Sequence, residues 1–286
     1  MRGCAIRIVG VASQLARHRM VRVAPLDPNR FRSVIPHYIN GRPPYAGRLV
    51  AKLAAETRLD AQSRALDLGC GPGTLTLPLS RYCGTMIGID ADAEMIAAAR
   101  RAAEIAGVDI DWHIGSSFDL DAALAPLHLV TIARAFHWMD REATLSRLDE
   151  LISPGGAVAL VNTELHDLGP TGWHAAFEEL RKGHGRFDDF YRWRKSEAWE
   201  EHTSVLLRSP FSDVESISVF EPRTTSLEEV VARALSFSAN SPAALGEDGC
   251  AAYEADVRQR MLAISPSGSF PEIVESVAII ARRPAP

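Results

Sequence analysis

The strongest constraint on the fold is the run ALDLGCGPG at residues 65–73. An apolar, strand-like segment carries an acid near its end and passes into three glycines at alternate positions. Such a turn is bare of side chains, so a ligand can lie directly against the main chain. A second acid, Asp90, ends the apolar stretch 86–89, where a carboxylate suits the hydroxyls of a ribose. The pattern predicts an adenosine-containing cofactor at the edge of a parallel sheet.

The loop also indicates which cofactor is bound. A dinucleotide-binding turn cradles a pyrophosphate, and Asp67, two residues before the first glycine, would repel that anion. The same carboxylate would attract a cationic amino group, and S-adenosylmethionine carries one beside its positive sulfonium. The glycines are spaced G-x-G-x-G instead of the G-x-G-x-x-G of dinucleotide binders. The loop therefore favours S-adenosylmethionine over NAD.

In this loop, together with Asp90, the sequence resembles the class I S-adenosylmethionine-dependent methyltransferases. The segment RAFHW at residues 134–138 is similar to a small-molecule subgroup that includes trans-aconitate and ubiquinone-pathway methyltransferases. The resemblance implies an enzyme that transfers a methyl group to a small-molecule acceptor, with oxygen, nitrogen and carbon all open as the attacking atom. It is most specific over residues 38–163 and weaker toward the C-terminus.

Strand-like apolar runs alternate with helix-like segments through the first half of the chain. Strands are predicted at 64–68, 85–90, 109–114, 127–133 and 157–163, which indicates a doubly wound parallel α/β sheet. Helices are predicted at 74–82, 94–106 and 142–152, and in the second half at 227–237 and 253–262. Late strands at 214–220 and 276–281 match the resembled family, whose Rossmann-like sheet has seven strands with the last antiparallel.

The domain organisation follows from the same reading. Residues 1–34 are expected to be an N-terminal extension, because the first 26 residues carry arginines and no acid. Residues 35–286 are expected to form one methyltransferase domain, with a helical, aromatic-rich insertion at about 164–205 that packs over the site.

Composition excludes several classes of protein. The net charge of −5 argues against a broad nucleic-acid surface, and no apolar run reaches the length of a membrane span. The four cysteines lie far apart and form no metal-ligand spacing, which predicts free thiols, a cytoplasmic location and no metal site. Nothing in the sequence indicates the oligomeric state.

The resemblance, with the predicted strand ends, also implies site residues. Asp67 is expected at the methionine end of the cofactor, Asp90 at the ribose, and Gly69 and Gly71 at the bare main chain. The adenine is expected against Ala91 and Met95, with Ser116 and Ser117 at its edge. Other residues expected at the cofactor are Ala133, Tyr38 and Arg42. His137 is the candidate general base, and the candidate substrate residues are Phe136, Trp138, Glu164 and His166.

Structural roles compete with these assignments. Asp67 and Asp90 would also suit helix capping, Met95 a helix core, Ser116 and Ser117 a turn, and His137 a wedge after the fourth strand. Two other functions stay open: a methyltransferase acting on protein or RNA, and a non-catalytic protein that binds S-adenosylmethionine.

Overall fold

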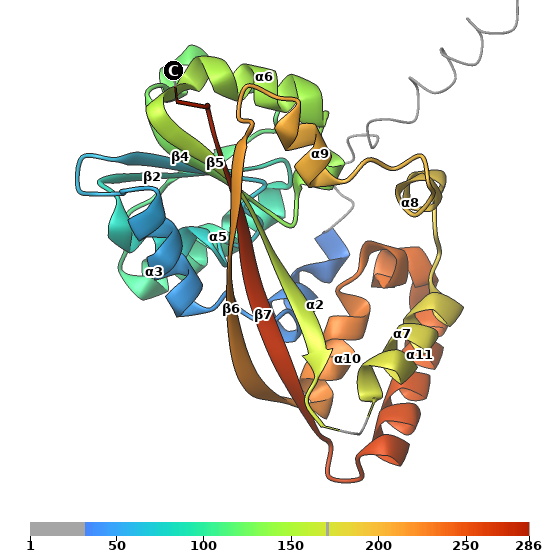
Figure 1. The fold of residues 1–286 in the computed structure, drawn as a ribbon. Helices are drawn as coiled ribbons and strands as arrows, with labels where there is room; N and C mark the ends of the chain where they lie inside the picture. Colours follow the sequence, from blue (N-terminus) through green and yellow to red (C-terminus); the bar gives the residue numbers. More distant parts are fainter. Residues whose placement is uncertain (1–31, 170–171, 286) are drawn as a thin grey trace, which may run out of the picture.

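The computed structural model describes residues 32–169 and 172–285. The predicted N-terminal extension lies almost wholly outside these residues. A seven-stranded sheet forms the centre of the molecule, in the order β3-β2-β1-β4-β5-β7-β6 (Figure 1). The strands are β1 (Arg64–Leu68), β2 (Thr85–Asp90), β3 (Asp111–Ile114), β4 (Leu127–Ala133), β5 (Ile152–Asp167), β6 (Asp213–Ser226) and β7 (Ser269–Arg282). Strand β7 runs antiparallel to both of its neighbours, and the pairs among β1 to β5 are parallel. The predicted fold class is confirmed.

Helices cover both faces of the sheet. Those of the first half are η1 (Arg32–Val34), α2 (Ile35–Gly41), α3 (Gly47–Glu56), α4 (Thr76–Leu79), η2 (Ser80–Tyr82), α5 (Ala93–Ala106), η3 (Ala122–Leu124), η4 (Phe136–Trp138) and α6 (Arg141–Leu151). Those of the second half are α7 (Trp173–His184), α8 (Asp189–Arg194), α9 (His202–Leu207), α10 (Leu227–Leu235), η5 (Ser238–Asn240) and α11 (Pro242–Ile264). Local signals set several ends: the Asp92 side chain caps α5, and Gly107 ends it in the left-handed conformation.

Two apolar cores lie on opposite faces of the sheet. On one face, leucines of α3 and α4 pack with residues of α5 against the sheet, as Leu49, Leu79 and Ile96 do. On the other face, α6 and α9 pack with Leu66 and Val130. Because β1 and β4 are buried on both faces, their sequences are nearly continuous apolar runs.

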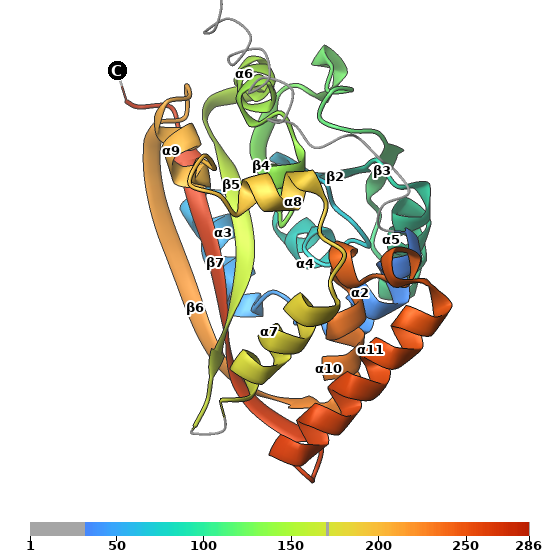
Figure 2. The ribbon, with the colours of Figure 1, turned by 90° about the vertical axis from the view of Figure 1, so that its right-hand side faces the viewer.

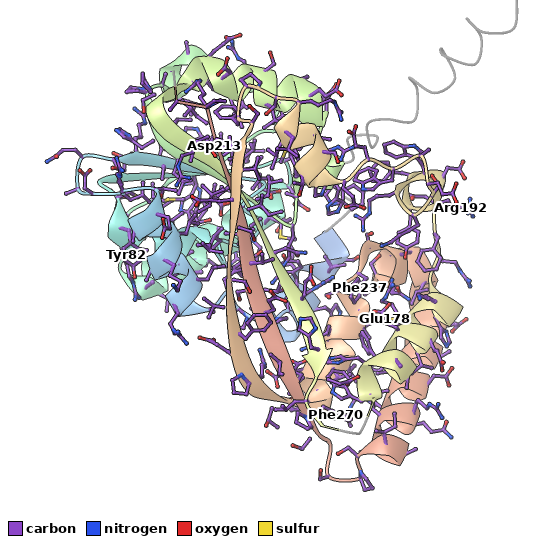
Figure 3. All side chains as sticks on the ribbon, viewed as in Figure 1. Tyr82, Glu178, Arg192, Asp213, Phe237 and Phe270 are labelled. Carbon is purple, nitrogen blue, oxygen red and sulfur yellow. The ribbon has the colours of Figure 1, made fainter. Side chains whose placement is uncertain are left out.

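A third apolar cluster lies beyond the sheet proper. Strands β5, β6 and β7 are much longer than the others and run on to a helical layer of α7, α10 and α11 (Figure 1). Trp173 of α7, Tyr253 of α11 and Phe270 of β7 are buried there, and Phe270 and Asp213 mark opposite ends of the long strands (Figure 3). Between α7 and α9, the short helix α8 spans the gap between the helical layer and the sheet (Figure 2).

Some predicted bounds were wrong. Strand β5 continues to Asp167 instead of ending at residue 163, because it pairs with β7 along that whole length. Helix α11 begins at Pro242 and not at residue 253, since Ser241 caps it and a proline fits its first turn, and a kink at Gly246 (φ 71°, ψ 175°) divides it. The helix predicted at 74–82 is divided into α4 and the 3-10 turn η2.

Two further predictions concern thiols and membranes. Cys70, Cys83 and Cys250 are free thiols, as expected, and Cys4 lies outside the described residues. Within the described part of the chain, no helix has both the length and the apolar character needed to cross a bilayer.

Candidate functional site

A cavity of about 1270 Å³ opens at the carboxyl ends of β1, β2 and β4. This is the point where the strand order reverses, between β1 and β4, and ligands of open α/β sheets bind there. The predicted site residues that line the cavity are Tyr38, Arg42, Gly69, Gly71, Asp90, Ala91, Met95, Ser116, Ser117, Ala133, Phe136, His137, Trp138 and Glu164. Asp67 and His166 are the two that do not.

The glycine loop provides bare main chain on the cavity floor. Gly69 and Gly71 have φ angles of 74° and 53°, in the left-handed region that favours glycine. A Cβ on Gly69 would lie 2.5 Å from the Cβ of Ala135, whereas a Cβ on Gly71 would meet nothing within 4 Å. Since Gly71 lines the cavity, that Cβ would take up ligand space. The loop thus leaves space for a ligand to lie directly against its backbone.

Asp90 at the end of β2 holds the loop in place. Its Oδ2 accepts a hydrogen bond from the Gly71 N–H at 2.8 Å, and its Oδ1 accepts one from the Asp92 N–H at 2.9 Å. Burial raises the pKa of this carboxyl, and the two backbone hydrogen bonds oppose that rise. Each oxygen keeps further acceptor capacity, which is what two neighbouring ribose hydroxyls require.

Asp67 does not line the cavity, and its contact with the cofactor stays a prediction. Its side chain is fully buried, and its two oxygens accept hydrogen bonds from the hydroxyls of Thr76 (2.6 Å) and Thr131 (2.8 Å). Burial raises its pKa to about 6, and the two hydroxyls lower it in part. Strand β1 directs this side chain beneath the loop, where its charge can act on a ligand only through space.

The predicted adenine end is formed by short segments after β2 and β3. Ala91 and the buried Met95 give it an apolar surface. The Ser116 hydroxyl donates to Asp119 Oδ2 at 2.7 Å, so this side chain closes a turn, as the alternative reading held. Ser117 also lines the cavity.

Helix α2 covers the cavity from the N-terminal side. Arg42 Nε donates to Ser236 Oγ at 2.8 Å and its guanidinium stacks 3.9 Å from the centre of the Phe237 ring. Burial, with the charge of Arg134 nearby, lowers the pKa of Arg42 to about 10, so it stays a cation at neutral pH. Arg134, just after β4, donates to Tyr38 Oη at 3.3 Å and to Thr163 Oγ1 at 2.8 Å.

The acceptor end of the cavity has aromatic walls. Phe136, His137 and Trp138 form the turn η4 after β4, opposite residues brought in by α8 and α9. The Trp138 and Phe190 rings lie 5.2 Å apart, and Phe136 meets His202 edge-on at 5.2 Å. These contacts close the side of the cavity that faces away from the glycine loop.

Both histidines at this end are neutral at ordinary pH. Burial and the charge of Arg194 lower the pKa of His137 well below its usual value. Burial and the charge of Arg141, whose Nη1 lies 3.2 Å from Nδ1 of His202, lower the pKa of His202 to about 4. A neutral imidazole can accept a proton, but nearby cations make the protonated form costly.

Glu164 and His166 separate at the end of β5. Glu164 lines the cavity, but the continuing strand carries His166 away to Glu275 of β7, with 3.0 Å between His166 Nε2 and Glu275 Oε2. His166 does not line the cavity, and its role as a substrate residue stays a prediction. Ligand atoms of these three side chains lie within 4.8 Å of one another, in an exposed arrangement that is common without a metal ion. The predicted lack of a metal site stays a prediction.

Several cavity residues were missed from the sequence. Arg134 was quoted only as part of a motif, although its positive φ of 57° marks an unusual turn after β4. Arg194, Trp199 and His202 come from the α8–α9 segment, which was predicted to cover the site without any residue being assigned. Its run of aromatic residues was the one available signal.

Comparison with known proteins agrees with this geometry. Residues 65–156 match a family described as a methyltransferase domain, and this range begins at the glycine-loop strand. A ubiquinone biosynthesis O-methyltransferase of Dinoroseobacter shibae is 28% identical over 224 residues, which cover 73% of this chain and 86% of that protein. An uncharacterized methyltransferase-like protein of Schizosaccharomyces pombe is 26% identical over 195 residues, covering 65% of this chain and 73% of the other.

Solved structures share the fold. A putative type II methyltransferase from Anaeromyxobacter dehalogenans superposes with a TM-score of 0.61 at 19% identity, over 85% of this chain and 97% of that one. The [4+2]-cyclase SpnF superposes with a TM-score of 0.51 at 17% identity, over 92% of this chain and 98% of the cyclase. At these identities the likeness concerns the fold alone, and the cyclase illustrates that one fold hosts different reactions.

Proposed function

Because this chain is a class I S-adenosylmethionine-dependent methyltransferase, we propose that its methyl acceptor is a small molecule and that the attacked atom is oxygen. The oxygen acceptor is supported by the ubiquinone-pathway O-methyltransferase relative, at low identity. The small acceptor is supported by the aromatic residues Phe136, Trp138 and Phe190, which line this end of the cavity.

We place the cofactor along the floor of the cavity. Asp90 would accept hydrogen bonds from the ribose hydroxyls, and Gly71 would let the cofactor lie against the loop. Ala91 and Met95 would contact the adenine. The buried charge of Asp67 would favour the cationic end through space. When bound, S-adenosylmethionine supplies a methyl group activated by its positive sulfonium.

The remaining space is the acceptor site. Residues of η4, α8 and α9 surround it, and their rings would hold an acceptor in place and exclude water, which is the main task of an enzyme that aligns two reactants. We propose that the segment 164–205 acts as a helical cap over this site within a single methyltransferase domain. A cytoplasmic location stays a prediction from the cysteine pattern.

His137 is proposed to contact the acceptor as a neutral imidazole. It lines the cavity beside Trp138, with the two ring centres 4.8 Å apart. Its lowered pKa keeps it unprotonated, so it can accept a hydrogen bond from an acceptor hydroxyl or take up its proton. The cations around it make full proton uptake difficult, and an acceptor that binds already ionised would need none.

A labelling experiment tests the small-molecule proposal. The purified protein is incubated with methyl-labelled S-adenosylmethionine and a cell extract that has been divided by size. We expect the label in low-mass products. Label only in the protein or nucleic-acid fraction would overturn the proposal and support a macromolecular acceptor. Binding of S-adenosylhomocysteine without transfer to any fraction would support a non-catalytic binding protein.

A further inference from the structure

We infer that the acceptor is an anion and that Arg194, together with Lys195, binds its negative group. This inference rests on the proposed function and names the substrate class of the same site. Both residues lie at the C-terminal end of α8 and line the cavity. The cavity surface that faces the acceptor therefore carries two adjacent cationic residues.

Within the described part of the chain, no carboxylate pairs with Arg194. Among residues 32–169 and 172–285, it takes part in no ion pair and no side-chain hydrogen bond that would hold its guanidinium. The side chain is half-buried, and this burial lowers its pKa. Of the other arginines in the segment 164–205, Arg192 pairs with Asp189 and Arg181 with Glu178, and Arg186 is exposed. A half-buried cation without a protein partner is costly, and a bound anion would remove that cost.

Six acids line the cavity, namely Asp90, Asp92, Glu164, Asp188, Glu201 and Glu215, and none of them forms an ion pair with Arg194 within the described residues. Asp90 accepts hydrogen bonds from backbone N–H groups at the cofactor end, and Glu215 pairs with Arg282. Asp188 caps α8 by accepting from the Tyr191 N–H. Glu164 lies next to the His166–Glu275 pair. Asp92 caps α5 at the cofactor end, and Glu201 precedes α9.

The histidines beside Arg194 add to the argument for an anionic acceptor. The charge of Arg194 acts on both His137 and His202, which are the imidazoles nearest the expected reaction. An imidazole that took a proton there would become a further cation among cations. The positive charge of these cations stabilises an oxyanion, because the two charges are opposite. The site is therefore suited to bind an acceptor that is already ionised.

The aromatic residues of the cavity indicate what the rest of the acceptor is like. Phe190 of α8 packs on Trp138, and Trp199 lies beside His202 with their ring centres 5.7 Å apart. Flat apolar walls next to an unpaired guanidinium suit a molecule with an apolar or aromatic skeleton and a carboxylate or comparable anionic group. The chemistry is that of an organic acid.

The experiment separates the acceptors by charge before the reaction. A low-mass cell extract is divided by ion exchange into anionic, neutral and cationic pools, and each pool is incubated with methyl-labelled S-adenosylmethionine. We expect the label to be transferred to the anionic pool. Transfer to the neutral or cationic pool instead would overturn the inference and leave the small-molecule function standing. Label found only in macromolecules would overturn the proposed function itself.

Two variants test whether Arg194 causes the preference for an anionic acceptor. Arg194→Gln should lower the rate of labelling of the anionic pool, at limiting pool concentration, by about ten- to a hundredfold, which is the usual effect of losing a hydrogen bond to a charged group. Arg192→Gln is the matched control, because Arg192 lies on the same helix, points to its outer side and pairs with Asp189 (Figure 3). It should leave the rate unchanged.

Calorimetry excludes damage to the fold as the cause. Arg194→Gln and Lys195→Gln should bind S-adenosylhomocysteine with the affinity of the wild type, since both residues lie on the cap and away from the glycine loop. Unchanged labelling by Arg194→Gln, or an equal loss in the Arg192→Gln control, would overturn the inference.

Discussion

The buried carboxylate of Glu272 on β7 should contribute strongly to the stability of this protein. Its side chain has no exposed surface, and both of its oxygens accept hydrogen bonds from the Arg233 guanidinium, at 2.7 and 2.8 Å. Burial by itself would raise its pKa, but the hydrogen bonds from Arg233 and His174 outweigh burial and lower the pKa to about 2. Arg233 also donates to the Gly41 carbonyl at 3.1 Å, which joins α2 to this pair.

The magnitude follows from the difference in pKa between the folded and unfolded chains. A fall from 4.5 to about 2 corresponds to roughly 3 kcal/mol of stability at pH 7. Because the folded pKa is the lower one, this stability is present above pH 4.5 and is lost as the pH falls through 2. At pH 3 only about 1.4 kcal/mol should remain.

Urea unfolding of Glu272→Gln at pH 7 and pH 3 measures this contribution. The variant should lose about 3 kcal/mol of unfolding free energy at pH 7, and its deficit should shrink by more than half at pH 3. Glu215→Gln is the control, because its ion pair with Arg282 on β7 is partly exposed to solvent and should contribute below about 1 kcal/mol. A deficit of the same size at both pH values would refute the electrostatic reasoning.

Three more predictions concern the site, and calorimetry with S-adenosylhomocysteine serves the first two. Asp90→Ala should weaken binding about a hundredfold or more while the fold is retained, because two charged hydrogen bonds to ribose are lost; unchanged affinity would refute the ribose role. Gly71→Ala should also weaken binding, since its Cβ enters the cavity and its φ of 53° is strained for alanine, whereas an unaffected Kd would show that the ligand does not touch the loop. His137→Gln should lower kcat and leave cofactor affinity intact. Because burial lowers the pKa of His137, the wild-type rate should show no inflection near pH 6.5, and an inflection there that vanishes in the variant would contradict the lowered pKa.

The sequence predicted the cofactor half of the molecule well. Strands β1, β2 and β4 begin and end at the predicted residues, because strands buried on both faces read as apolar runs with clear ends. The residues at their carboxyl ends, such as Asp90 and Ala133, could be assigned to one site, since parallel strands bring these ends together. Asp67 was placed on the correct strand, but which way its side chain points depends on the partners Thr76 and Thr131.

The second half of the chain was harder to predict because long-range contacts determine it. The extension of β5 to Asp167 depends on pairing with β7, which lies about a hundred residues later in the chain. Glu272 interrupts the apolar pattern of β7, and only its ion pair with Arg233 explains a charge at that buried position. Arg194 and His202 reach the cavity from segments without a regular apolar period, so no pattern indicated them.

The length of β5, β6 and β7 has a mechanical consequence. Paired along 14 residues, β6 and β7 form a twisted ribbon roughly 45 Å long, and shifting their register would break a row of hydrogen bonds at once. These paired strands should therefore be rigid. They hold the glycine-loop side of the sheet at a fixed distance from the helices α7, α10 and α11 at their far end (Figure 1). Since α8 is short and lies beside these strands, we expect adjustment to acceptors of different size in the α8 segment (Figure 2).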